Sequence, residues 1–128
     1  MEFTSQICTT KEQSERLLKM GIKAETADMH HYKWSEGYWD IQSCPPRGTE
    51  SCYIPAWSLH RLIEKMPNEI FYEDSTLILG VSFDCVYYAD NEYGEVFQSF
   101  DGNAYNCIIK CIEWLIKEGY FNKEYLED

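Results

Sequence analysis

Residues 69–100 read EIFYEDSTLILGVSFDCVYYADNEYGEVFQSF, and this stretch decides the fold. It is rich in β-branched and aromatic residues, and turn-forming residues interrupt it at 73–75 and 90–94. The pattern predicts an antiparallel meander of three strands, with Gly80 as a bulge in a long middle strand over 76–89. Because side chains alternate along a strand, one face of this sheet should meet helices and the other should partly meet water.

Three helices are expected to pack against this sheet, at 10–20, 55–66 and 102–118. The first follows Thr9 and Thr10, each with a Glu or Gln three residues later, which is the spacing of a capping box. Gly21 suits its left-handed C-terminal cap. Pro55 suits the first position of the second helix, where its missing N–H costs nothing, and Pro67 marks the end of that helix.

The third helix has Asp101 as its expected N-cap and Gly119 as its C-terminal cap. Apolar residues occupy most of its sides, so we expect it to be the central buried helix. Cys107 and Cys111 lie four positions apart in this apolar run. We interpret them as core thiols rather than as metal ligands or a reactive pair.

An aromatic hairpin is expected near 31–42, where aromatic segments flank a short turn that contains Gly37. Its large aromatic residues are Tyr32, Trp34, Tyr38 and Trp39. They cannot all point inward from a two-stranded ribbon, so some should be exposed and should be able to anchor a protein interface. Trp34 and Trp39 are therefore candidate binding residues, unless the helices or the loop over 44–53 cover them.

Length and composition favour one domain. The chain has 128 residues, of which 45% are hydrophobic, and we expect residues 1–128 to form a single α+β domain around one core. Residues 1–8 contain no basic region followed by an apolar stretch, and no window is apolar enough to span a membrane. We therefore expect a cytoplasmic protein whose six cysteines are reduced.

The charge of the chain is distributed unevenly. Residues 1–65 carry eight basic and nine acidic groups, a net charge of −1, whereas residues 66–128 carry three and thirteen, a net charge of −10. An acidic half repels nucleic acid and anionic membranes and attracts cations or basic proteins. The candidate binding acids lie in two turns and an edge strand: Glu73, Asp74, Asp90, Glu92 and Glu95. The alternative is that these acids only solubilise the turns and block edge-to-edge strand pairing.

The sequence contains no catalytic or cofactor motif. Seven residues separate Cys44 from Cys52, a spacing that matches no zinc site, and the scattered glycines form no phosphate-binding loop. Carboxylate pairs are abundant, but randomly placed surface acids would give the same number. We therefore expect no catalytic residue, no metal and no cofactor.

Three segments carry a resemblance: residues 10–29 (TKEQSERLLKMGIKAETADM), 54–62 (IPAWSLHRL) and 101–120 (DGNAYNCIIKCIEWLIKEGY). In this order they resemble a family of small uncharacterised proteins from prophages and other mobile elements of gut anaerobic bacteria. The resemblance implies shared ancestry and cytosolic expression. It implies no function, because that family has no known activity or catalytic residue to carry over.

We therefore expect a non-enzymatic protein-interaction module of mobile-element origin, which binds a protein partner through the acidic sheet surface or the aromatic hairpin. A basic protein is one candidate partner, for example a nuclease or repressor whose groove the acids would occupy by mimicry of nucleic acid. A homodimer is also compatible with the exposed aromatics, whereas direct binding to nucleic acid or membrane is not expected. The alternative is a small enzyme or ligand-binding domain with a site assembled from distant His, Cys and carboxylate residues.

Overall fold

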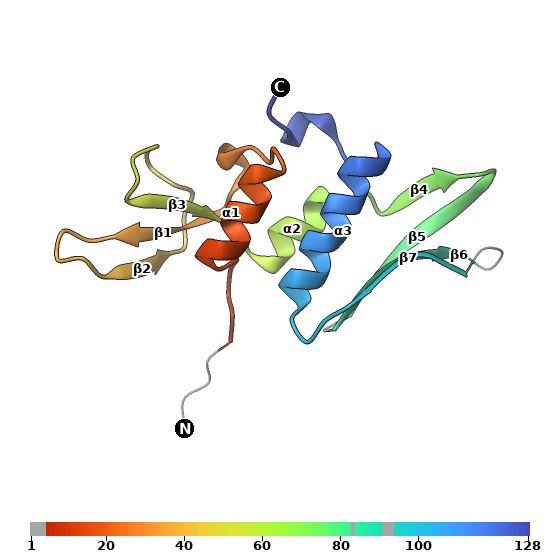
Figure 1. Cartoon of the computed structure of the whole chain (residues 1–128), viewed down its shortest axis with the longest axis horizontal. Helices are drawn as coiled ribbons and strands as arrows, with labels where there is room; N and C mark the ends of the chain where they lie inside the picture. Colours follow the sequence, from red (N-terminus) through yellow and green to blue (C-terminus); the bar gives the residue numbers. More distant parts are fainter. Residues whose placement is uncertain (1–4, 83, 91–93) are drawn as a thin grey trace. The chain divides into compact units, whose positions relative to one another are not determined.

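The computed structural model describes residues 5–82, 84–90 and 94–128, and its class is α+β, as predicted (Figure 1). The chain forms two compact units. The N-terminal unit comprises residues 1–62 and 124–128, and the C-terminal unit comprises residues 63–123. In the described part of the chain, no helix has the length and apolar character that a membrane span requires.

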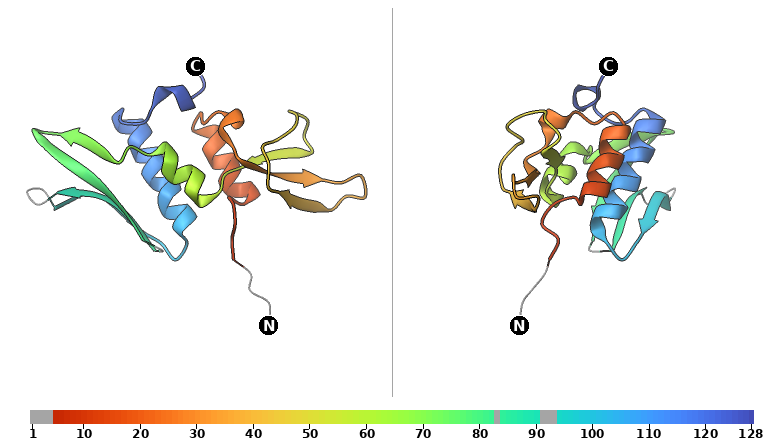
Figure 2. Two further views of the ribbon diagram at one scale, coloured as in Figure 1. Left: turned by 180° about the vertical axis from the view of Figure 1, so that it is seen from behind. Right: turned by 60° about the vertical axis from the view of Figure 1, so that its left-hand side comes forward.

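The N-terminal unit is built around a three-stranded sheet (Figures 1 and 2). Its elements are α1 (Lys11–Lys19), the 3-10 helix η1 (Ala24–Thr26), β1 (Met29–Lys33), β2 (Trp39–Gln42) and β3 (Tyr53–Ala56). Helix α2 (Leu59–Lys65) and the 3-10 helix η2 (Lys123–Tyr125) each have residues in both units. The strand order is β2-β1-β3, and both pairs are antiparallel. The predicted hairpin is therefore confirmed as β1 and β2, and β3 adds a third strand.

Local capping defines α1 as the sequence predicts. The hydroxyl of Thr10 accepts a hydrogen bond from the Gln13 N–H at 3.1 Å, and the Gln13 side chain accepts one from the Thr10 N–H at 3.0 Å. At the other end Gly21 has a φ of +98°, and the Ile22 N–H donates to the Leu17 carbonyl. The capping box and the left-handed glycine cap are both confirmed.

The second helix begins later than predicted. Pro55 lies in β3 instead of opening a helix. Because β3 is an edge strand with β1 as its one neighbour, a proline without an N–H is tolerated there. Ser58 caps α2 instead, because its hydroxyl accepts a hydrogen bond from the Arg61 N–H at 3.2 Å. Asp28 in turn accepts a hydrogen bond from the Ser58 N–H at 2.9 Å. The predicted start at residue 55 is therefore wrong.

Trp57, between β3 and α2, anchors the core of the N-terminal unit. Its side chain is fully buried, and its indole N–H donates to the Thr26 hydroxyl at 3.1 Å. Its main chain exchanges two hydrogen bonds with Thr9, one from the Trp57 N–H to the Thr9 hydroxyl and one from the Thr9 N–H to the Trp57 carbonyl. This one residue therefore fastens β3 to η1 and to the segment before α1.

The C-terminal unit contains a four-stranded meander and one long helix. Its elements are β4 (Glu69–Tyr72), β5 (Ser75–Val81), β6 (Cys85–Asp90), β7 (Gly94–Phe100) and α3 (Ala104–Glu118). The strands are adjacent in the order β4-β5-β6-β7, and each neighbouring pair is antiparallel. The predicted antiparallel meander is confirmed, with four strands instead of three.

The single middle strand predicted over 76–89 is wrong, because the chain reverses between Val81 and Cys85. There the Ser82 N–H donates to the Cys85 carbonyl at 2.8 Å. Ser and Asp both favour turns, but here they interrupt a nearly continuous apolar run, which conceals the reversal.

Gly80 is not the site of the expected bulge. The irregularity in the meander lies between Tyr88 and Ala89 in the pairing of β6 with β7. Gly80 instead makes room for an aromatic ring, since a Cβ built on it would lie 2.1 Å from Cζ of Tyr87. A glycine at this position lets the tyrosine lie across the neighbouring strand.

Helix α3 lies along one face of the four-stranded sheet, which we call the inner face (Figures 1 and 2). The Trp114 ring stacks on Phe97 with a centroid separation of 5.0 Å and contacts Tyr88 at 5.9 Å. Leu77 and Val86 of the sheet are fully buried. Most sides of α3 are also buried, as predicted for a central helix.

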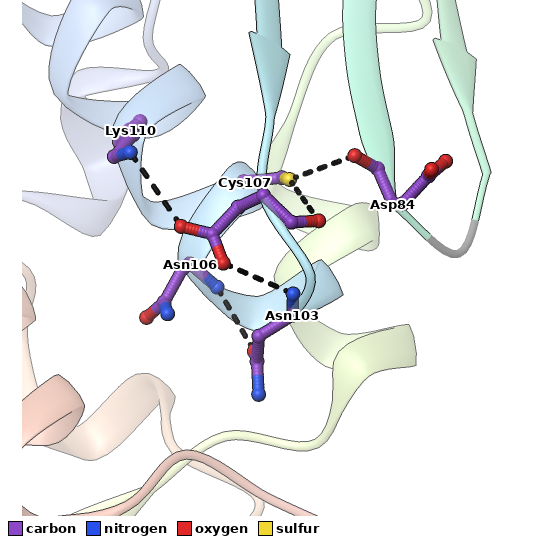
Figure 3. Close-up of polar contacts among 6 residues, drawn as sticks. Asp84, Asn103, Asn106, Cys107 and Lys110 are labelled. Atoms are coloured by element: carbon purple, nitrogen blue, oxygen red, sulfur yellow. Dashed lines mark hydrogen bonds and ion pairs between the residues drawn. The ribbon is translucent and has the colours of Figure 1, made fainter.

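Figure 3 shows the N-terminus of α3, where the predicted N-cap is wrong by two residues. The cap is Asn103, whose side-chain oxygen accepts a hydrogen bond from the Asn106 N–H at 3.2 Å. Asp101 instead accepts a hydrogen bond from the Asn103 N–H at 3.0 Å and forms an ion pair with Lys110 at 3.6 Å. The C-terminal cap is the predicted Gly119, with a φ of +83°.

Replacing Trp57 with phenylalanine should lower the free energy of unfolding by about 1–3 kcal/mol, because it removes the buried hydrogen bond to Thr26 and leaves unfilled volume. Trp34→Phe is the matched control, since Trp34 is 40% exposed. It should change stability by no more than about 0.5 kcal/mol. Urea unfolding followed by circular dichroism measures both, and equal losses would contradict the role given to Trp57.

Candidate interaction surfaces

The face of the four-stranded sheet opposite α3, here called the outer face, carries apolar side chains that are exposed. They are Phe71 (72%), Ile78 (60%), Tyr87 (36%) and Phe100 (64%). Cys85, Tyr87 and Ala89 share this face of β6 by alternation. Phe100 pairs with Cys85 and Ile78 pairs with Ala89, so the face extends across β5, β6 and β7.

The meander brings four of the five predicted acidic residues to one end of this sheet. The β4–β5 turn, the end of β6 and the start of β7 lie at the same end of the sheet because successive strands run in opposite directions. Glu73 and Asp74 form the first turn, with positive φ values of 42° and 67°. Glu95 is exposed in β7, and Asp90 accepts a hydrogen bond from a serine of β5. Glu92, the fifth predicted acid, lies outside the described residues.

The two predicted tryptophans lie on opposite faces of the three-stranded sheet. Trp34 is 40% exposed and stands edge-on to Tyr32, with the ring centroids 5.0 Å apart. Trp39 is half-buried, and the Lys11 ammonium lies 4.5 Å from the centre of its ring. The structure therefore does not unite these residues in one surface.

Trp34 belongs to a pocket of about 220 Å³, which we call the aromatic pocket. Its lining residues are His30, Tyr32, Trp34, Gln42, Cys44, Arg47 and Tyr53. The Tyr53 ring lies 5.2 Å from that of Tyr32 and 5.5 Å from that of His30. The Nδ1–H of His30 also donates a hydrogen bond of 2.8 Å to the Cys44 carbonyl, which holds the following loop on the sheet.

Sequence reasoning missed Gln42, Arg47 and Tyr53. Gln42 and Tyr53 reach the pocket because β2 and β3 both pair with β1, where they lie opposite His30 and Tyr32. The sequence did indicate that side chains alternate between the two faces of β1. The expected helix start at residue 55 concealed β3, and with it the position of Tyr53.

The aromatic pocket does not offer the arrangement that nucleophilic catalysis needs. His30 and Cys44 both line the pocket, but the His30 imidazole donates its hydrogen bond to the backbone carbonyl of Cys44 and not to the Cys44 thiol. An activated thiol requires a base within hydrogen-bond reach. Across residues 5–82, 84–90 and 94–128, no group of three or more His, Cys, Asp and Glu side chains could hold a metal ion.

Four of the cysteines are buried thiols, which confirms the interpretation of Cys107 and Cys111. Burial raises the pKa of Cys111 to about 12 and, with the nearby Asp28 carboxylate, that of Cys8 to about 11. The pKa of Cys107 is also raised, mainly by burial, and its thiol donates to the Asp84 carbonyl at 3.4 Å (Figure 3). The thiols of Cys8, Cys107 and Cys111 are therefore protonated at neutral pH.

Comparison of the chain with protein families, with curated proteins and with solved structures finds no match. A functional proposal therefore rests on the outer face and the aromatic pocket themselves.

At pH 8 the native protein should react quickly with Ellman's reagent only at Cys44 and Cys52, which are half-buried, while the four buried thiols react slowly. Absorbance at the thionitrobenzoate band counts the fast thiols. The double variant Cys44→Ser/Cys52→Ser should lose the fast phase. A fast phase that persists in this variant would place a reactive thiol at one of the buried positions.

Proposed function

We propose that this chain is a non-enzymatic protein-interaction module that binds its partner through the outer face of the four-stranded sheet. The observation that supports this most directly is the exposure of Phe71, Ile78 and Phe100, each 60% or more, on one sheet face. Contiguous exposed apolar surface is uncommon in monomeric proteins and marks interaction sites. Aromatic side chains are also the residues that most often anchor protein interfaces.

The charges around the outer face favour a basic partner. Residues 67–109 contain no Lys or Arg, so no cation from this stretch borders the apolar side chains. Glu69 pairs with Ile78 and Glu95 pairs with Ala89, which places exposed carboxylates beside the apolar rows. A partner with an apolar centre and a rim of Lys or Arg complements this surface in shape and charge.

Self-association through the same face is the less favourable arrangement. Each outer face carries the carboxylates of Glu69 and Glu95 and no Lys or Arg from residues 67–109, so like charges oppose the association of two such faces. A heteromeric complex with a basic protein avoids this repulsion. The resemblance of residues 10–29, 54–62 and 101–120 to prophage proteins supports a mobile-element origin for such a module.

Replacing Phe71 and Phe100 with serine should weaken partner binding by at least about tenfold, since each removes an exposed apolar anchor worth about 1 kcal/mol or more. Thermal stability should change little, because both side chains are more than 60% exposed. The measurement is retention of host proteins on the tagged chain, quantified by mass spectrometry. Undiminished retention of the same proteins by the double variant would refute the outer face as the binding surface.

Reversing charge at Glu69 and Glu95 to lysine should release the same partner at lower salt, because complementary charge at a rim is screened by ions. The control reverses Glu15 and Glu36, which are exposed in the N-terminal unit and change the net charge equally. Elution in steps of rising salt compares the two variants. Elution of both variants at the same salt concentration would contradict a basic partner. Analytical ultracentrifugation tests the alternative: a dimer that becomes stronger in Glu69→Lys/Glu95→Lys would indicate self-association.

A further inference from the structure

We propose that the aromatic pocket of the N-terminal unit binds a proline-rich peptide segment in the polyproline II conformation, with an acidic residue beside the prolines. This site is separate from the outer face, and it would take a ligand of opposite charge. The rings, the hydrogen-bond donors and the charge of the pocket each fit such a segment.

The aromatic rings form a surface on which proline rings can stack. The Tyr32 and Tyr53 rings are tilted by 53° with centroids 5.2 Å apart, and Trp34 stands at 86° to Tyr32. Trp34 and the neighbouring Tyr38 are 40% and 58% exposed, so a ligand can reach them. Grooves lined by aromatic residues recognise polyproline II segments, which are already extended and lose little conformational entropy on binding.

The pocket also offers donors for the backbone of such a ligand. A polyproline II segment makes no internal hydrogen bonds, so its carbonyl groups remain acceptors. Gln42 uses one amide hydrogen to bond Asp40 at 3.2 Å and has a second to donate. The Arg47 guanidinium and the hydroxyls of Tyr32 and Tyr53 are further donors among the lining residues.

The charge of the residues that line the aromatic pocket favours one type of residue beside the prolines of the ligand. Arg47 contributes a positive charge, and none of the described lining residues of the aromatic pocket is a carboxylate. A methylated lysine, which aromatic cages otherwise accept, would meet repulsion from Arg47. An acidic side chain next to the prolines instead pairs with the guanidinium, which binds carboxylates in a bidentate manner.

The dimensions favour an extended ligand over a compact one. At about 220 Å³ the aromatic pocket is smaller than pockets for drug-sized molecules, which span about 300–1,000 Å³. A second hollow of about 610 Å³ shares Arg47 and Tyr53 with it, and its other lining residues include Leu18, Pro46, Pro55 and the acidic Glu25. A peptide can place one residue in the aromatic pocket, hold its acidic residue at Arg47, and continue with its prolines over the apolar residues of the second hollow.

The loop that forms one wall of the pocket is held at both ends. At its start the Cys44 carbonyl is bonded to His30, and at its end the Lys33 N–H donates to the Cys52 carbonyl at 2.9 Å. The Tyr53 N–H also donates to the Glu50 carbonyl at 3.0 Å. The wall is therefore formed before a ligand arrives, which lowers the entropy cost of binding.

The test titrates the full chain with the acetylated and amidated peptide EPPPPPE, followed by isothermal titration calorimetry and by tryptophan fluorescence. Binding should be saturable, and Trp34→Ala and Tyr53→Ala should each weaken it by about tenfold or more. Trp39→Ala is the matched control, because it removes the same residue type from the opposite face of the hairpin and should bind as the wild type does. Arg47→Gln should weaken binding of EPPPPPE severalfold but leave binding of QPPPPPQ unchanged.

Three results would overturn the proposal. The first is no saturation with peptide up to about 1 mM, the concentration that corresponds to a binding free energy of only about −4 kcal/mol. The second is equal affinity for EPPPPPE and for EPGPGPE, in which glycine removes the polyproline II preference. The third is binding of adenosine monophosphate, a planar anionic probe, that depends on Trp34 while the peptide does not bind. Circular dichroism of each variant establishes that it is folded.

Discussion

The alternation of side chains along a β-strand is the constraint on which both units depend. Each sheet has two faces, and in each unit a helix packs against one of these faces. In the C-terminal unit Trp114 of α3 packs on Tyr88, while Phe100 on the other face is 64% exposed. In the N-terminal unit the Lys11 ammonium of α1 lies over Trp39, while Trp34 on the other face borders the aromatic pocket. Both candidate surfaces therefore arise from the same property of the strand.

Exposed apolar faces carry a risk of aggregation, and the charge of the chain opposes it. Sheet edges and apolar sheet faces associate readily unless charge or geometry prevents it. In this chain residues 67–109 carry eight carboxylates and no Lys or Arg, so two such faces repel each other. The same carboxylates attract a basic surface. Solubility and the proposed choice of partner would thus be two effects of one feature, so the interpretations of the acids as solubilising charges and as binding residues are compatible.

The features that the sequence predicted well are those decided by nearby residues. The capping box at Thr10 and the left-handed glycines at 21 and 119 involve hydrogen bonds between residues a few positions apart, and they are found as expected. The errors arose where distant residues decide the outcome. Pro55 lies in a strand because β1 pairs with it, and the start of α2 is fixed by Asp28, thirty positions before Ser58. The face on which each tryptophan lies likewise depends on the register of β1 with β2 and β3, which periodicity alone does not supply.

The two proposed binding surfaces differ in charge, which would allow them to discriminate between ligands. A basic ligand that complements the outer face is disfavoured at the aromatic pocket by Arg47, and an acidic proline-rich segment is disfavoured at the outer face by Glu69 and Glu95. Specificity is a difference between two binding free energies, and a repulsive contact in the wrong site contributes to that difference as much as an attractive one in the right site. The uneven charge, −1 in residues 1–65 and −10 in residues 66–128, therefore has a physical consequence beyond solubility. Under the two proposals, it assigns ligands of different charge to different sheets of one small chain.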